Sequence, residues 1–175
     1  MDTSDRKQHV VMPLPGCEPE IGRALWMLGD CRQRTRRALD NLNPAAVDWI
    51  GGFNGHSIGS LLYHIAAIEI SWLGFEVAEG KLPESVWDHF PYEVRDDQGR
   101  LTAVPGLSLD EHWQRLDYVR GLLLDVYKPM TLAEYRRPRH LDEYDVTPEW
   151  VLHHLMQHEA GHRDEIEMLR QAAKV

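Results

Sequence analysis

The sequence has few cysteines, few basic residues and no obvious long apolar run, and each shortage excludes a class of protein. Cys17 and Cys31 are too few and too far apart for the disulfide framework of a small secreted domain or for a CxxC metal site. Lysine and arginine together number 19 against 28 acidic residues, which gives a formal net charge of -9. This charge, with no basic block beside aromatic residues, argues against nucleic acid as a partner.

Apolar segments that would direct the chain to a membrane are also missing from the sequence pattern. The first sixteen residues contain no apolar stretch long enough for a signal-peptide core, and we expect no later run to span a bilayer. We therefore expect a cytoplasmic protein without a membrane span. With 175 residues, 43% hydrophobic and 27% charged, the composition is typical of one globular domain over residues 1–175.

The hydrophobic pattern predicts four helices and no convincing β-strand. The expected ranges are residues 19–42, residues 58–80 after Ser57 as N-cap, residues 109–128 after Ser108, and residues 148–175 after Thr147. Ser108 and Glu111 have the spacing of a capping box. The fold class is therefore all-α, a four-helix bundle, with long connecting loops at residues 43–56, 80–107 and 129–146.

Histidine is the residue type in local excess, because four of the ten histidines fall within residues 153–162. His158 and His162 are spaced i, i+4 and share one helical face with Val151, Leu155, Ile166 and Leu169. His64 interrupts a second apolar stripe, formed by Leu61, Ile68 and Phe75. If these two helices are neighbours, the three imidazoles can converge on one divalent metal ion. The alternative is that the histidines are ordinary hydrogen-bonded core residues.

The segment from His158 to His162 also satisfies two other metal motifs. It reads HExxH, in which two histidines bind zinc and Glu159 serves as general base, but no histidine follows to complete the metzincin pattern. Glu159 and His162 have the Glu-x-x-His spacing of di-iron bundles, but no second copy of this motif is found. Glu159 is kept as a candidate base or as a residue that orients a ligand, with a solvated surface position as the alternative.

Two segments together resemble the DinB/YfiT-like family of damage-inducible proteins, which are four-helix bundles expected to be metal-dependent enzymes. They are SIGSLLYHIAAIE, at residues 57–69, and LHHLMQHEAGHRDEI, at residues 152–166. The resemblance assigns the metal ligands to His64, His158 and His162. It also matches His154 to a recurrent family histidine, which we expect to support the site or pack beside it. This chain departs from many relatives at Asp164 and Glu165, where they read Gly-Gln.

The resemblance implies an S-transferase that attaches a low-molecular-weight thiol to a small-molecule electrophile. A metal-dependent hydrolase of a small ester or amide and a non-catalytic metal-binding protein are the alternatives, which the sequence does not separate. Zinc and nickel are the favoured ions, although histidine sites also accept iron and copper. The resemblance further favours a homodimer.

Overall fold

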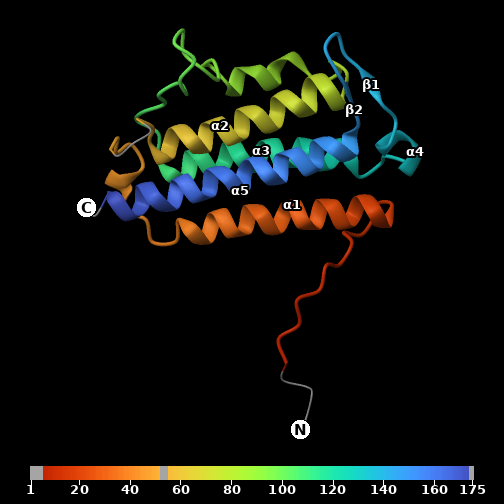
Figure 1. Cartoon of the computed structure of the whole chain (residues 1–175), viewed down its shortest axis with the longest axis horizontal. Helices are drawn as coiled ribbons and strands as arrows, with labels where there is room; N and C mark the ends of the chain where they lie inside the picture. Colours follow the sequence, from red (N-terminus) through yellow and green to blue (C-terminus); the bar gives the residue numbers. More distant parts are fainter. Residues whose placement is uncertain (1–5, 52–54, 174–175) are drawn as a thin grey trace.

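The computed structural model describes residues 6–51 and 55–173, and four long helices pack side by side within these ranges (Figure 1). They are α1 (Pro19–Ala38), α2 (Ile58–Trp72), α3 (Leu109–Tyr127) and α5 (Pro148–Ala172). Helix α5 packs against both α1 and α2, and α3 packs against α2. The predicted all-α four-helix bundle is confirmed.

The helices begin where the sequence predicted; α2, α3 and α5 each start at a polar side chain that satisfies a free N–H group, and α1 starts at Pro19. Ser57 and Thr147 each accept a hydrogen bond from the backbone N–H three residues later, at 3.1 Å. Ser108 and Glu111 form the expected reciprocal capping box. Helix α1 ends before the predicted Leu42, because Leu39 is its C-cap and Asn41 has a positive φ of 57° that a helix cannot continue.

The long connections contain short elements of their own. The first includes the 3-10 turn η2 (Pro44–Ala46), and the second includes the 3-10 turn η4 (Glu84–His89). The third folds as α4 (Leu132–Tyr135) and a hairpin of β1 (Arg139–His140) and β2 (Asp145–Val146), which lies at one end of the bundle (Figure 1). Strands of two residues are too short to produce an alternating pattern, and the sequence therefore did not predict them.

Helix α2 changes its geometry near its end and continues as the π-helical turn η3 (Leu73–Val77). The backbone N–H of Ala78 donates to the carbonyl of Leu73, five residues earlier, at 2.8 Å. A π turn adds a residue to the turn and rotates the side chains that follow. Phe75 is consequently 57% exposed, so its predicted place in the apolar stripe of His64 is wrong.

The segment Ile58–Val77 is long and apolar enough to cross a membrane by length and composition alone, contrary to the sequence expectation. In the structure, however, 78% of its most apolar window is buried inside the bundle. Helix α2 packs against α3 and α5. Over the described residues, the chain thus has the features of a soluble domain with one buried apolar helix.

Gly59, near the start of α2, allows this helix to pack very closely against α3 and against the connection that precedes α2. A Cβ atom at Gly59 would lie 2.9 Å from Nε2 of His112 and 3.3 Å from Cγ1 of Val47. His112 is 1% exposed, and burial lowers its pKa to about 4, so the ring is neutral at pH 7. This contact leaves no room for a larger residue at position 59.

Candidate metal centre

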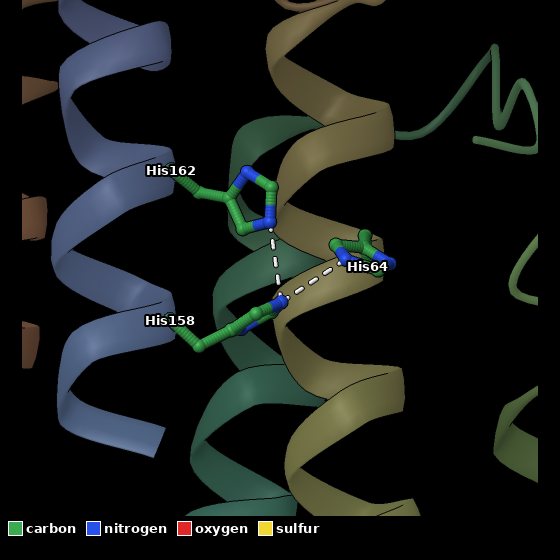
Figure 2. Close-up of side chains that lie close together, drawn as sticks. All are labelled: His64, His158 and His162. Atoms are coloured by element: carbon green, nitrogen blue, oxygen red, sulfur yellow. Dashed lines mark hydrogen bonds between the residues drawn. The ribbon is translucent and has the colours of Figure 1, made fainter. Parts of the chain in front are cut away.

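Three histidines from two helices meet between α2 and α5 (Figure 2). The Nε2 atom of His158 lies 3.1 Å from Nε2 of His64 and 3.1 Å from Nε2 of His162. One ligand atom from each residue lies within 4.8 Å of the other two. We call these residues the histidine cluster.

The helical geometry explains why the three rings meet. His158 and His162 lie one turn apart on α5, so both rings point from the same face. Helix α2 runs antiparallel to α5 and places His64 opposite that pair. The packing of α2 against α5 thus brings together His64, His158 and His162, the three residues that the sequence pattern selected.

The protein environment keeps the cluster uncharged. Burial, followed by the neighbouring His162, lowers the pKa of His64 to about 4. Burial, followed by His162 and His64, lowers the pKa of His158 to about 3. Burial also lowers the pKa of His162, although the nearby Glu165 opposes this shift. At neutral pH the cluster therefore presents neutral imidazoles, which is the form that binds metals.

The spacing of the nitrogen atoms fits a common metal ion. Two nitrogens that are each about 2.0–2.1 Å from a tetrahedral ion lie about 3.3 Å apart. The two separations of 3.1 Å are close to this value. Two neutral rings at this distance can also share a hydrogen bond when one Nε2 carries the proton, and a metal ion would replace that proton. The donor set thus fits a divalent metal.

Glu165 lies behind one ring of the cluster, a contact that the sequence analysis did not predict. Its Oε1 atom is 3.1 Å from Nδ1 of His162, so a protonated Nδ1 donates to the carboxylate and leaves Nε2 free. Such carboxylates orient metal-binding histidines and make them more basic. The i, i+3 spacing between His162 and Glu165 was the feature of the sequence that could have predicted this contact. By contrast, Nδ1 of His64 is buried with no hydrogen-bond partner in the described part of the chain.

His154 packs beside the cluster and not in it. Its ring stacks on Trp150, with centroids 5.1 Å apart and an interplanar angle of 6°, and lies 4.5 Å from the ring of Trp72. Its centroid is 6.0 Å from that of His158. These contacts are those of a packing residue, one of the two roles expected for it. His153 is exposed.

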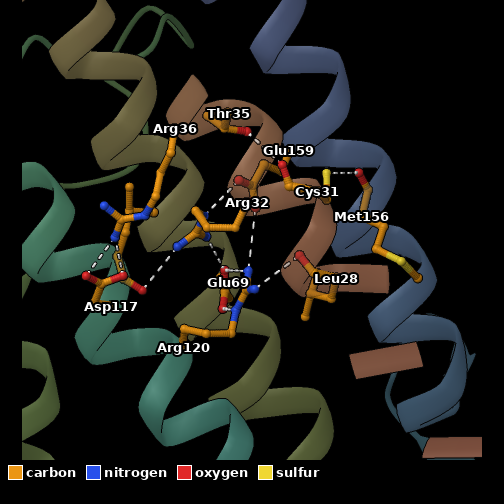
Figure 3. A network of polar contacts seen from close by, with 11 residues as sticks. Leu28, Cys31, Arg32, Thr35, Arg36, Glu69, Asp117, Arg120, Met156 and Glu159 are labelled. Atoms are coloured by element: carbon orange, nitrogen blue, oxygen red, sulfur yellow. Dashed lines mark hydrogen bonds and ion pairs between the residues drawn. The ribbon is translucent and has the colours of Figure 1, made fainter. Parts of the chain in front are cut away.

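Glu159 is buried in a network of ion pairs (Figure 3). It is 1% exposed, and its Oε1 atom accepts from Nε of Arg32 at 2.7 Å. Arg32 also donates to Glu69 at 2.8 Å, and Arg120 lies within ion-pair distance of both glutamates. We call these four residues, from α1, α2, α3 and α5, the buried ion quartet. The solvated alternative for Glu159 is wrong, and its carboxylate is engaged by arginine, which argues against the expected role as a base.

Comparisons with known proteins agree with this picture. The model of the DinB superfamily matches residues 27–166, a range that includes all three histidines of the cluster. The uncharacterized protein YkkA of Bacillus subtilis (strain 168) is 27% identical over 120 residues, which are 68% of this chain and 67% of that protein. A conserved protein from Enterococcus faecalis, known from a crystal structure, has a similar fold with a TM-score of 0.65. That similarity covers 85% of this chain and 93% of the other at 13% identity, so it shows the fold alone.

Proposed function

We propose that this chain is a metal-dependent enzyme that joins a small thiol to an electrophile, because it belongs to the DinB superfamily and brings three neutral imidazoles to one point. The observation that carries the proposal is the convergence of the three Nε2 atoms between α2 and α5, with His64 buried and the other two rings partly buried. Zinc and nickel are the ions that we propose for it.

The donor set determines the chemistry that the site supports. Three protein ligands is the number found in catalytic zinc sites, which keep a further position for water or substrate. The three ligands are uncharged, so they leave the positive charge of the ion uncompensated. When bound, such an ion lowers the pKa of a coordinated thiol and makes it a thiolate nucleophile at neutral pH.

The residues of the chain prepare the site for this ion. Burial keeps His64 and His158 deprotonated, and Glu165 holds His162 with its Nε2 lone pair directed into the cluster. The adjacent quartet links the four long helices and thereby holds α2 and α5 in register. The chain thus supplies a preformed site with little reorganisation on binding.

The position of Glu159 favours a thiol over water as the nucleophile. A hydrolase of the HExxH type needs this glutamate as a general base, but here its carboxylate is bound to Arg32. Water has a pKa of about 15.7, whereas a thiol ionises near 8.5 and needs much less help. In the proposed reaction the thiol proton passes to solvent, the sulfur forms an S–C bond, and the leaving group departs with the electron pair of the broken bond.

Elemental analysis of the purified protein and of single variants tests the proposal. We expect about one divalent ion per chain in the wild-type protein and a large loss of metal in His64→Ala and His158→Ala. The matched control is His153→Ala, which removes an exposed histidine from the same helix and should retain the metal. Circular dichroism should show that all three variants remain helical.

Activity measurements on the metal-loaded protein then separate the alternatives. Conjugation of a low-molecular-weight thiol to an aryl electrophile, lost in His158→Ala and kept in His153→Ala, supports the transferase. Ester or amide hydrolysis with the same dependence on His158 would replace it with a hydrolase. Metal binding without either activity would indicate a non-catalytic protein, and a wild-type chain that binds no metal would end the proposal. The homodimer and the cytoplasmic location remain predictions.

A further inference from the structure

A second feature beside α2 and α5 is a cavity lined by aromatic side chains. It has a volume of about 570 Å³ and lies where the end of α2, the start of α5 and the β1–β2 hairpin meet. Trp72, Tyr144 and Trp150 contribute its aromatic surface, and Pro138 and Val146 add apolar walls. We call it the aromatic cavity. Its size falls in the range of about 300–1,000 Å³ that holds small molecules.

The aromatic cavity and the histidine cluster lie along the same pair of helices. Trp72 follows His64 by eight residues on α2, and Trp150 precedes His158 by eight residues on α5. Because the two helices are antiparallel, both tryptophans lie about two turns, or about 12 Å, along the helices from the cluster. The ring of His154 fills the interval, in contact with Trp150 and facing His158.

The aromatic rings form a braced surface for a flat molecule. The ring of Trp72 lies 5.4 Å from that of Trp150 and 6.2 Å from that of Tyr144. The hydroxyl of Tyr144 donates to Oε1 of Glu76 at 3.0 Å and so holds its ring in place. Trp150 and Tyr144 are nevertheless 47% and 44% exposed, which leaves stacking surface for a ligand.

The charge of the aromatic cavity selects against anions. Asp145 is the charged side chain in its wall, and no lysine or arginine lines it among the residues that the structure describes. The arginines nearest to the hairpin, Arg136 and Arg137 before it and Arg139 in β1, are each paired with a glutamate. Asp145 has its Oδ1 atom 2.7 Å from Nδ1 of His140, which is a cation only when protonated, so a thiol that carries carboxylates would meet Asp145 with no lysine or arginine in the wall.

We infer that the aromatic cavity binds an uncharged, planar apolar group of the electrophile and that the thiol binds elsewhere at the cluster. This inference rests on the proposed function for the words electrophile and thiol, but binding of the planar group requires no metal. The substrate class is an elongated molecule with an aromatic end and a reactive carbon about two helical turns away. The cavity thus determines specificity and does not take part in bond making.

A matched pair of probes tests the inference. Titration calorimetry of the full chain with 2-naphthol and with 2-naphthalenesulfonate compares one ring system with and without a negative charge. We expect the neutral probe to bind at least about tenfold more tightly than the anion. Trp150→Ala should weaken the neutral probe by about tenfold, whereas Trp87→Ala, which removes a tryptophan stacked on Phe75 outside the cavity, should not change it.

Three results would overturn the inference: equal binding of the two probes, undiminished binding to Trp150→Ala, or equal losses in Trp150→Ala and Trp87→Ala. Indole N–H signals in NMR spectra of each variant verify the fold and report whether Trp72 shifts on addition of 2-naphthol. The titration is repeated with His158→Ala. If that variant lacks metal and still binds 2-naphthol, the two sites are independent. Failure of the metal proposal then leaves the cavity proposal standing, and failure of the cavity proposal leaves the metal proposal standing.

Discussion

Replacement of Arg32 by methionine tests the role of the buried ion quartet most directly. The Arg32 side chain is only 5% exposed and donates to Glu159 at 2.7 Å, to Glu69 at 2.8 Å and to the carbonyl of Leu116 at 3.2 Å. Methionine keeps most of the apolar stem and removes the charge. The quartet, which is neutral with two arginines and two glutamates, is then left with one uncompensated negative charge.

The expected loss of stability follows from that charge. Removal of one partner from a buried ion pair costs about 3–5 kcal/mol, and Arg120 still compensates part of the charge, so we expect about 3 kcal/mol. For a chain of this length, that loss lowers the melting temperature by about 10 °C. Arg36→Met is the control, because Arg36 lies one turn later on α1 and pairs with the exposed Asp117 of α3, and its loss should cost at most about 1 kcal/mol.

Urea unfolding at pH 7, with metal removed from every sample, measures both losses. The difference between Arg32→Met and wild type should also shrink in acid. Burial alone would raise the pKa of Glu69, but Arg120 and Arg32 reverse this and hold it below 4.5. A depressed carboxylate pKa stabilises the native protein above pH 4.5, and this stabilisation is lost as the pH falls through the folded-state value. A loss in Arg32→Met no larger than that in Arg36→Met would refute the reasoning.

Three further predictions concern the site and the packing of α2. Glu165→Gln should weaken metal affinity by about 10- to 100-fold in a competition titration. Glu167→Gln, two residues later on a different face of α5, should leave the affinity unchanged. Equal effects of the two substitutions would contradict the assigned contact between Glu165 and the cluster. Gly59→Ala should lower the free energy of unfolding in urea by about 1–3 kcal/mol, because the new Cβ collides with the buried His112 of α3. Gly121→Ala, with open space around its Cβ, should leave this free energy unchanged or raise it. Burial lowers the pKa of His64 from 6.5 to about 4, so the unfolded state binds more protons than the folded state between these pH values. The metal-free protein should therefore lose stability as the pH falls from 6.5 to 4. This pH dependence should be reduced in His64→Ala.

The sequence alone determined most of the fold. Apolar periodicity and the caps Ser57, Ser108 and Thr147 predicted the four long helices, because these signals act within a few residues along the chain. The same periodicity placed His158 and His162 on one core face. Local signals are written into the order of residues, and they can therefore be recognised without coordinates.

Only the tertiary structure decided which of these residues meet. The positions of His64 opposite α5 and of Glu159 against Arg32, 127 positions away, depend on how the helices pack. Two neighbours on one helix, His158 and Glu159, point to different partners because α5 contacts α1 on one side and α2 on another. The aromatic cavity is likewise lined by segments that are distant in sequence, which no periodic pattern records.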